Sequence, residues 1–378
     1  MLGSSEDNKL NWILGLYYFD EDGENVNTLD FTISNFISGG EFENTSKAVF
    51  GQATLDVTDW FSLTLGLRYT EEDKAFKPDQ VILQNYFAGS GDPLLDAPFM
   101  QAGSRILPLA TDKLSIYEVT PMVNAAFHLS EQAMVYTSYS EGFKSGGFTQ
   151  RVFPPLVAGV TAPAGASDTD LIPDFEPEFV DVYEVGLKYT GWENRLQLNT
   201  AAFHTRYEDL QVQVFTSVAP VTKNAASAKV SGWEMELNLL PAENWQVDAS
   251  YGWLNARYED IDFNETFIVQ GNAFERVPER TASLAVSREF YTTIGKFTAR
   301  LDWSYRSKEH TPEISSSVTC LNLLVVLHSK LKTSCLLTQQ LCCQSQSVLR
   351  RGDKRPLNRR YGRLRSKEQK FSYPLFFG

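Results

Sequence analysis

Several stretches of the chain alternate apolar and polar residues with a period of two, and this alternation constrains the fold more than any other feature. In residues 61–70 (FSLTLGLRYT) every odd-numbered position is apolar, and the even-numbered positions are small, polar or basic. Residues 297–306 (FTARLDWSYR) repeat the pattern, with Arg300, Asp302 and Arg306 on the polar side. Side chains of a β-strand point alternately to two faces, so these stretches predict long strands with one apolar and one ionisable face.

The same pattern extends along most of the chain and predicts about eleven strands, most of them longer than the roughly five or six residues usual in soluble proteins. The predicted strands are 10–19, 44–55, 60–70, 115–128, 132–141, 179–189, 195–207, 228–240, 245–257, 279–290 and 296–307. Short turns are predicted near 56–59, 129–131, 190–194, 241–244 and 291–295. Long polar connections are predicted at 20–43, 71–114, 143–178, 208–227 and 258–278.

Short turns at one end and long connections at the other, on strands with one apolar face, are typical of a transmembrane β-barrel. Lipid accepts such a structure because a closed ring pairs every backbone polar group. Aromatic residues near the strand ends are predicted to form the two interfacial girdles: Trp12, Tyr18, Trp60, Tyr69, Trp192, Trp245, Tyr258 and Trp303. A soluble antiparallel sandwich or propeller also alternates, but it seldom places Arg, Glu and Asp so regularly opposite its apolar face.

The last part of the chain differs from the rest in charge, cysteine content and periodicity. Residues 311–378 contain 12 Lys+Arg and 3 Asp+Glu, whereas residues 1–310 contain 22 and 44. All four cysteines also lie after residue 310. We therefore predict an all-β, partial antiparallel transmembrane barrel over residues 1–310, followed by an irregular, basic, cysteine-containing, non-barrel tail over residues 311–378. One hypothesis is that this tail is an out-of-frame translation.

Motifs of catalysis and cofactor binding are absent from the sequence. It contains no nucleophile elbow, phosphate-binding loop, HExxH motif or spaced set of metal ligands, and its four histidines are isolated. We expect no enzyme activity, no cofactor and no metal site. The basic run at 350–365 does not indicate nucleic-acid binding, because no fold is predicted around it.

Acidic residues are concentrated in the long connections, as in 167–178 (SDTDLIPDFEPE). Such segments repel anions and attract cations or cationic complexes. The simpler interpretation is a solvated, mutually repulsive surface that keeps the connections soluble.

A set of strand ends resembles the C-terminal barrel region of TonB-dependent outer-membrane receptors, in both order and spacing. The resemblance covers roughly residues 10–310. The segments that carry it are 136–148 (YTSYSEGFKSGGF), 175–178 (FEPE), 183–190 (YEVGLKYT), 201–211 (AAFHTRYEDLQ) and 230–236 (VSGWEME).

The resemblance implies a barrel of about 22 strands, occluded by an N-terminal plug, that binds scarce ligands such as ferric siderophores at its extracellular side and imports them with energy from TonB. This sequence departs from that pattern at both ends. Residues 1–10 are not a secretory signal, residues 11–19 are already a strand where a plug and a TonB box would precede, and Gly378 follows the last aromatic residue. The expectation is a fragment that is not competent for energised transport by itself.

The expected function is that of a receptor or transporter fragment in the Gram-negative outer membrane, taking up a ferric siderophore or a similar scarce solute. The expected partners are outer-membrane lipid, this ligand and, through the family, TonB, with no nucleic acid. Ligand contacts are expected in the loops 71–114 and 143–178, without assignment to individual residues. A passive porin-like channel or structural barrel, and a soluble β-rich binding module, are the alternatives.

Overall fold

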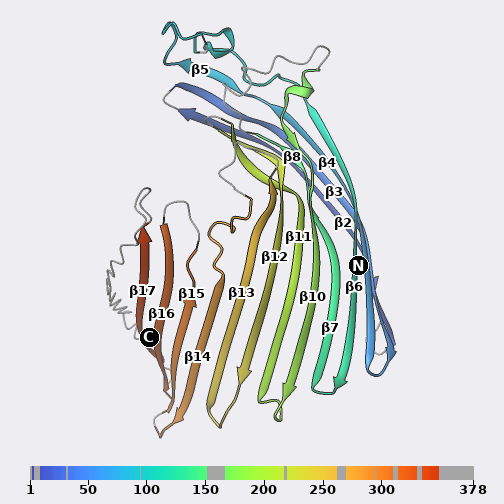
Figure 1. Cartoon of the computed structure of the whole chain (residues 1–378), viewed down its shortest axis with the longest axis vertical. Coiled ribbons are helices and arrows are strands. Elements are labelled where there is room, and N and C mark those ends of the chain that lie inside the picture. The colour runs from blue at the N-terminus through green and yellow to red at the C-terminus, as the bar shows by residue number, and fades with distance from the viewer. Residues whose placement is uncertain are drawn as a thin grey trace, which may run out of the picture.

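In the computed structural model, the described residues form one large, curved antiparallel sheet and one small sheet (Figure 1). The large sheet has 15 strands, of which the last in the chain lie at one edge and the first at the other. The structure describes residues 2–3, 9–30, 33–93, 95–150, 167–216, 219–261, 270–293, 295–309, 314–329 and 334–348.

Strands that are neighbours in the chain pair antiparallel throughout the large sheet, except that β5 pairs with β3. The strands are β1 Leu2–Gly3, β2 Leu10–Asp30, β3 Ser34–Thr58, β4 Phe61–Pro78, β5 Val81–Asn85, β6 Asp112–Ser130, β7 Ala133–Lys144, β10 Glu178–Gly191, β11 Leu196–Thr216, β12 Ala219–Leu239, β13 Trp245–Ile261, β14 Arg280–Tyr291, β15 Gly295–Arg306, β16 Ile314–Ser329 and β17 Ser334–Val348. The small sheet pairs β8 Gly147–Phe148 with β9 Asp174–Phe175. Two 3-10 turns, η1 Pro98–Met100 and η2 Thr169–Leu171, complete the described elements. Within the described residues, no helix has the length and apolar character needed to span a membrane.

The eleven strands predicted from the alternation are all present, and the all-β fold is confirmed. Several of them continue beyond the predicted ends, so that most of the connection predicted at 20–43 is an extension of β2 and β3. The connection predicted at 208–227 is likewise mostly β11 and β12. Polar residues misled the prediction at 20–30, because a sheet can be polar on both faces while its backbone remains paired.

The sheet also continues past residue 310, where the sequence predicted an irregular tail. β16 pairs with β15, and β17 pairs with β16. Backbone pairing does not require alternating side chains, and β-branched residues such as Val318, Val325 and Val326 favour strands. The expectation of irregular structure therefore does not describe 314–329 and 334–348. Residues 349–378 lie outside the described part, and a separate segment starting near 310 stays a prediction.

Pairing between strands brings the predicted apolar residues together on one face. Val49, Tyr69 and Val119 lie side by side on β3, β4 and β6, and they are 43%, 41% and 51% exposed. Tyr139 and Tyr183 face each other on β7 and β10, with ring centroids 4.9 Å apart. This row of exposed apolar side chains is the face that suits contact with lipid.

The opposite face carries the ionisable residues, as the alternation predicted. Arg300 on β15 donates from Nη1 to Asp248 on β13 at 3.3 Å and from Nε to Asp302 at 2.9 Å. Nearer the other side of the sheet, the hydroxyl of Tyr136 donates to Glu184 at 2.6 Å. The polar face is thus linked by hydrogen bonds between strands.

Three of the predicted girdle aromatics lie at the short-turn end of the sheet. Trp60 is 58% exposed beside the ring of Phe61. Trp192 lies under the guanidinium of Arg195, in the turn between β10 and β11. Trp245 begins β13. Large amphipathic rings at this level suit a membrane–water interface.

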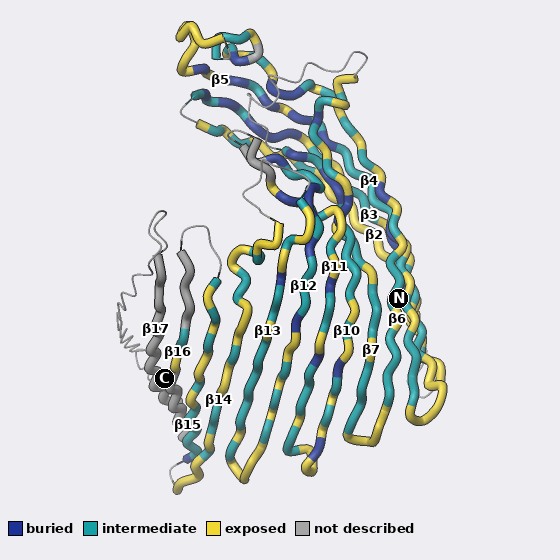
Figure 2. The backbone as a smooth tube through the Cα atoms, viewed as in Figure 1, coloured by how far each residue is buried: buried dark blue, intermediate teal, exposed yellow. Residues whose placement is uncertain are grey.

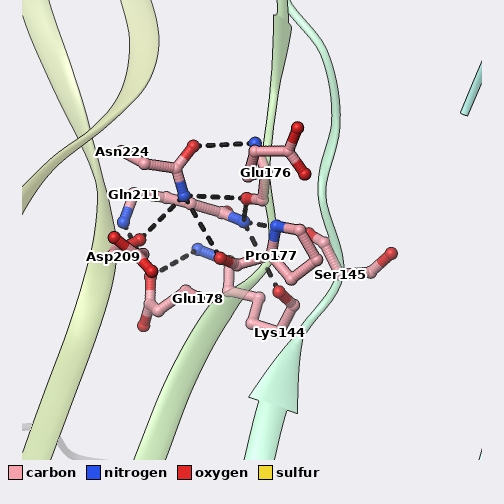
Figure 3. A network of polar contacts seen from close by, with 8 residues as sticks. All are labelled: Lys144, Ser145, Glu176, Pro177, Glu178, Asp209, Gln211 and Asn224. Atoms are coloured by element: carbon pink, nitrogen blue, oxygen red, sulfur yellow. Dashed lines mark hydrogen bonds and ion pairs between the residues drawn. The ribbon is translucent and has the colours of Figure 1, made fainter. Parts of the chain in front are cut away.

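Buried residues, in contrast, gather toward the long-connection end (Figure 2). A polar network there fastens the segment between β9 and β10 onto β11 and β12 (Figure 3). The Asn224 side chain accepts from the Glu176 N–H at 2.7 Å and donates to the carbonyls of Glu176 and Asp209, both at 2.8 Å. Gln211 donates from its side chain to the carbonyls of Glu176 and Ser145, both at 3.0 Å.

The backbone conformation of Asp209 and the close packing of Gly146 are both compatible with this network. Asp209 adopts a left-handed conformation (φ 53°) at a bulge between β11 and β12, a region that Asp tolerates better than most residues. Gly146 packs so closely against the backbone of Phe175 that an added Cβ would lie 2.4 Å from the Phe175 carbonyl oxygen. The glycines at the end of β7 thus permit the close approach of two backbones, in addition to ending the strand.

Replacing Asn224 with leucine removes the side-chain hydrogen bonds that hold the Glu176 backbone. We expect a local loss of about 2–3 kcal/mol, since each net hydrogen bond contributes roughly 1 kcal/mol. Amide hydrogen exchange at Glu176, whose N–H is bonded to Asn224, measures this loss directly. Asn238→Leu, on an exposed position of the same strand, is the matched control. Equal exchange rates at Glu176 in the two variants would contradict the role given to Asn224.

Candidate ligand-binding site

Both loops in which ligand contacts were expected lie at the same end of the sheet, around β5 and β8 (Figure 1). In the loop 71–114, β4 continues to Pro78, and β5 and η1 follow before β6 begins. In the loop 143–178, β7 ends at Lys144, and β8, η2 and β9 lead to β10. The part of this loop at 151–166 lies outside the described residues.

The loop 71–114 folds into a small apolar core against β3. Phe36, Ile82, Met100 and Leu107 are at most 1% exposed, and Leu29, Ile33 and Leu95 pack around them. Full burial of one such side chain stabilises by about 1.5–3 kcal/mol. The sequence analysis treated this loop as a polar connection, and the apolar runs at 81–83 and 106–107 were the available signal for the core.

A cavity of about 310 Å3 lies between β2, β3, the β8–β9 pair and the ends of β11 and β12. Its walls contain four amide side chains, three hydroxyl side chains and two phenylalanine rings, and none of them is ionisable. The lining residues are Asn25, Asn27, Ser38, Gly39, Phe148, Thr149, Gln150, Phe175, Gln213 and Thr222. Side-chain amides both donate and accept, so this wall suits a ligand with many uncharged polar groups.

Gly39 allows the strands at one wall of the cavity to approach each other. Its φ is 144°, and an added Cβ would lie 1.6 Å from the carbonyl oxygen of Asn25. Asn25 in turn accepts from the Asn27 side chain at 2.7 Å and donates to that of Gln150 at 3.5 Å. The amides of β2 are thereby joined to the segment that follows β8.

The Thr149 side chain is 7% exposed, and its Oγ1 has no hydrogen-bond partner among the described residues. The fully buried Gln80 donates from Nε2 to the carbonyl of Gln150 at 2.8 Å, but its Oε1 is also without a partner. Buried polar atoms are nearly always bonded, and each exception asks for an explanation. Both atoms belong to groups at or beside the cavity wall.

Carboxylates lie near the β8–β9 wall of this uncharged cavity. Burial raises the pKa of Asp112, and the negative charges of Asp174 and Asp170 raise it further against the opposing hydrogen bond from the Lys113 N–H. Asp174 pairs with Phe148, which lines the cavity. Negative charge therefore lies beside the β8–β9 wall of the cavity.

Lys74 on β4 contacts the chain just before β8. Its Nζ donates to the carbonyl of Gly146 at 2.7 Å and lies 3.8 Å from a carboxylate oxygen of Glu72. Burial lowers the pKa of Lys74, and the charge of Glu72 opposes this shift. Its ammonium group is thus hydrogen-bonded to the chain beside β8.

A second cavity, of about 440 Å3, lies on the polar face of β12–β15, away from the two loops. Its ionisable lining residues are Glu236, Asp248, Arg300 and Asp302. Arg300 bonds two of these carboxylates, those of Asp248 and Asp302. In the described part of the chain, no three His, Cys, Asp or Glu side chains are grouped so as to hold a metal ion.

Comparison with known proteins identifies receptors to which this chain is similar. The probable TonB-dependent siderophore receptor PiuA of Acinetobacter baumannii is 25% identical over 247 residues, covering 63% of this chain and 28% of PiuA. The catecholate siderophore receptor Fiu of Escherichia coli O157:H7 is 27% identical over 211 residues, covering 54% of this chain and 25% of Fiu. The chain thus spans between a quarter and a third of these relatives.

Solved structures share the fold at low sequence identity. The crystal structure of the ferric yersiniabactin uptake receptor FyuA from Yersinia pestis superposes with a TM-score of 0.68 at 18% identity, over 90% of this chain and 46% of FyuA. A family model described as TonB dependent receptor-like, beta-barrel, matches residues 2–320. With its open antiparallel sheet, its exposed apolar face and a family match over most of its length, the chain belongs to the TonB-dependent receptor-like β-barrel family.

Proposed function

We propose that this chain is the ligand-binding part of a Gram-negative outer-membrane receptor for TonB-dependent uptake of a scarce solute, and that this solute is a ferric siderophore. The observation that carries the proposal is the polar cavity at the long-connection end of a sheet from this family. The names of PiuA and Fiu as siderophore receptors support the choice of solute.

The sheet geometry supports a membrane location. An exposed row of apolar side chains opposes a polar face, and tryptophans lie at the short-turn end. A soluble binding module would have to cover this apolar face, and no described element does so. We therefore place the short turns on the periplasmic side, and the loops 71–114 and 143–178 on the extracellular side.

Ligand contacts are assigned to these two loops and to the cavity beside them. The loop 71–114 contributes the apolar core that supports β3, and the loop 143–178 contributes Phe148, Thr149, Gln150 and Phe175 to the lining. The strands β11 and β12 add Gln213 and Thr222. The cavity is therefore lined by the loop 143–178 and by strands on both sides of it, while the loop 71–114 contributes no lining residue and supports β3.

Energised transport is not proposed for this chain acting alone. In the described residues, β17 pairs only with β16, and β1 pairs only with β2. Unpaired strand edges are severely disfavoured in lipid, so insertion requires further strands that complete the ring. The TonB complex is the proposed energy source for the completed receptor.

The test is a ligand titration of the full chain, refolded in detergent micelles and checked for β-sheet by circular dichroism. We expect ferric chelates of the siderophore type to quench tryptophan fluorescence saturably, and the iron-free chelators to bind more weakly. Absence of saturable binding by any ferric chelate, with the sheet intact, would overturn the proposed function.

Replacing Gln213 with tryptophan tests whether the cavity is the site. The larger ring fills the cavity beside Thr222 and is expected to weaken chelate binding at least about tenfold, a loss of roughly 1.4 kcal/mol. Gln197→Trp, at an exposed position near the other end of the same strand, is the matched control and should bind like the unmodified chain. Equal affinity in both variants would place the binding site elsewhere.

A further inference from the structure

We propose that the cavity selects ferric chelates by charge: it accepts neutral or singly positive chelates with an amide-rich or hydroxamate-rich periphery, and it rejects polyanionic ones. This inference rests on the proposed function and adds the chemical class of the ligand. It comes from the composition of the cavity wall, from one unpaired hydroxyl, and from the charges around the mouth.

The cavity wall offers hydrogen bonds and apolar contact without any charge. Asn25, Asn27, Gln150 and Gln213 present amides that can pair with the amide or hydroxamate groups of a ligand. Phe148 and Phe175 present apolar surface to the ligand's carbon chain. An anionic ligand would lose its hydration here without meeting a cation, which is strongly unfavourable.

Thr149 supplies the most specific feature of the wall. Its backbone N–H donates to the Pro173 carbonyl at 2.8 Å, which fixes the residue in place. Its Oγ1 is buried and has no partner among the described residues, although it belongs to a cavity-lining side chain. A hydroxyl can both donate and accept, so a neutral polar group of a ligand can satisfy it.

The surroundings of the cavity are acidic on two sides. Residues 20–43, which include most of the β2–β3 extension, contain seven Asp+Glu and no Lys or Arg. Residues 167–178, which lead from η2 to the start of β10, contain five Asp+Glu and no Lys or Arg. Such a surface repels a negatively charged ligand and attracts a positively charged one.

Four basic side chains of the adjoining segments are engaged with partners of their own. Lys77 lies 3.2 Å from Glu41, Lys144 lies 3.7 Å from Glu178, and Arg105 lies 2.8 Å from Asp79. Lys74 donates to the Gly146 carbonyl. These cations are neutralised by their own partners and offer little compensation to an anionic ligand.

Three ferric chelates of similar size test the inference on the refolded full chain. They are ferrioxamine B, a singly positive tris-hydroxamate; its N-acetylated derivative, which is neutral; and a hexadentate tris-catecholamide chelate, which is triply negative. We expect the first two to bind with affinities within about tenfold of each other, and the third to bind at least about a hundredfold more weakly at low salt.

Charge substitution in the wall should shift this preference in opposite directions. Asn27→Lys is expected to strengthen binding of the triply negative chelate at least about tenfold, and Asn27→Asp to strengthen binding of the singly positive one relative to the neutral one. Asn238→Lys and Asn238→Asp, on the strand β12 outside this cavity, serve as matched controls and should change neither preference.

The variant Thr149→Val tests whether Thr149 contacts the ligand or only stabilises the protein. The substitution keeps the shape of the side chain and removes a hydroxyl that has no partner in the described protein, so the ligand-free chain should unfold at the same or a higher denaturant concentration. Binding of the neutral chelate should weaken about tenfold. Unchanged binding together with lower stability would assign Thr149 to the structure alone and remove this support from the inference.

These measurements distinguish a failure of charge selection from a failure of the proposed receptor function. Tighter or equal binding of the triply negative chelate by the unmodified chain overturns charge selection and leaves the receptor function standing. Absence of saturable binding by all three chelates overturns both. Preference for the neutral and singly positive chelates, narrowed by Asn27→Lys, supports the inference.

Discussion

Backbone hydrogen bonds between neighbouring strands hold the large sheet together from β1 to β17, and within the described residues no second layer covers either face. An ordinary soluble sheet would expose too much apolar surface in this state. The row through Val49, Tyr69 and Val119 suits contact with lipid, while the hydrogen-bonded polar face, with Asp248 and Arg300, suits an aqueous interior. The proposed membrane location rests on this division between the two faces.

The same backbone pairing continues toward the long-connection end of the sheet, where it positions the candidate binding site. The extensions of β2 and β3 carry many polar residues, and together with the ends of β11 and β12 they surround the uncharged cavity. Asn224 and Gln211 then attach the segment around Glu176 to these extensions, which brings Phe148 and Phe175 to the cavity wall. The site is thus made of sheet and of loops fastened to it.

Much of the fold could be predicted from the residues. Each of the eleven predicted strands is present, because apolar positions at a spacing of two in 61–70 and 297–306 suit only an element that projects side chains alternately to two faces. The ends of the strands were less predictable. The polar run after Asp20 was taken for a connection, although it continues β2, since hydrogen bonds to the neighbouring strand and not side-chain polarity decide where a strand ends.

The sequence by itself determined the class of fold, the two opposite faces, the direction of the short turns and the family resemblance, because these depend on local periodicity and on the order of motifs. Only the tertiary structure decided the site. Asn25, Thr149, Phe175 and Gln213 are separated by long stretches of chain, and they come together because strand register and the Asn224 network place them around one cavity. Contacts between residues so distant in the chain leave no local pattern, so a single sequence could name the loops but not the residues.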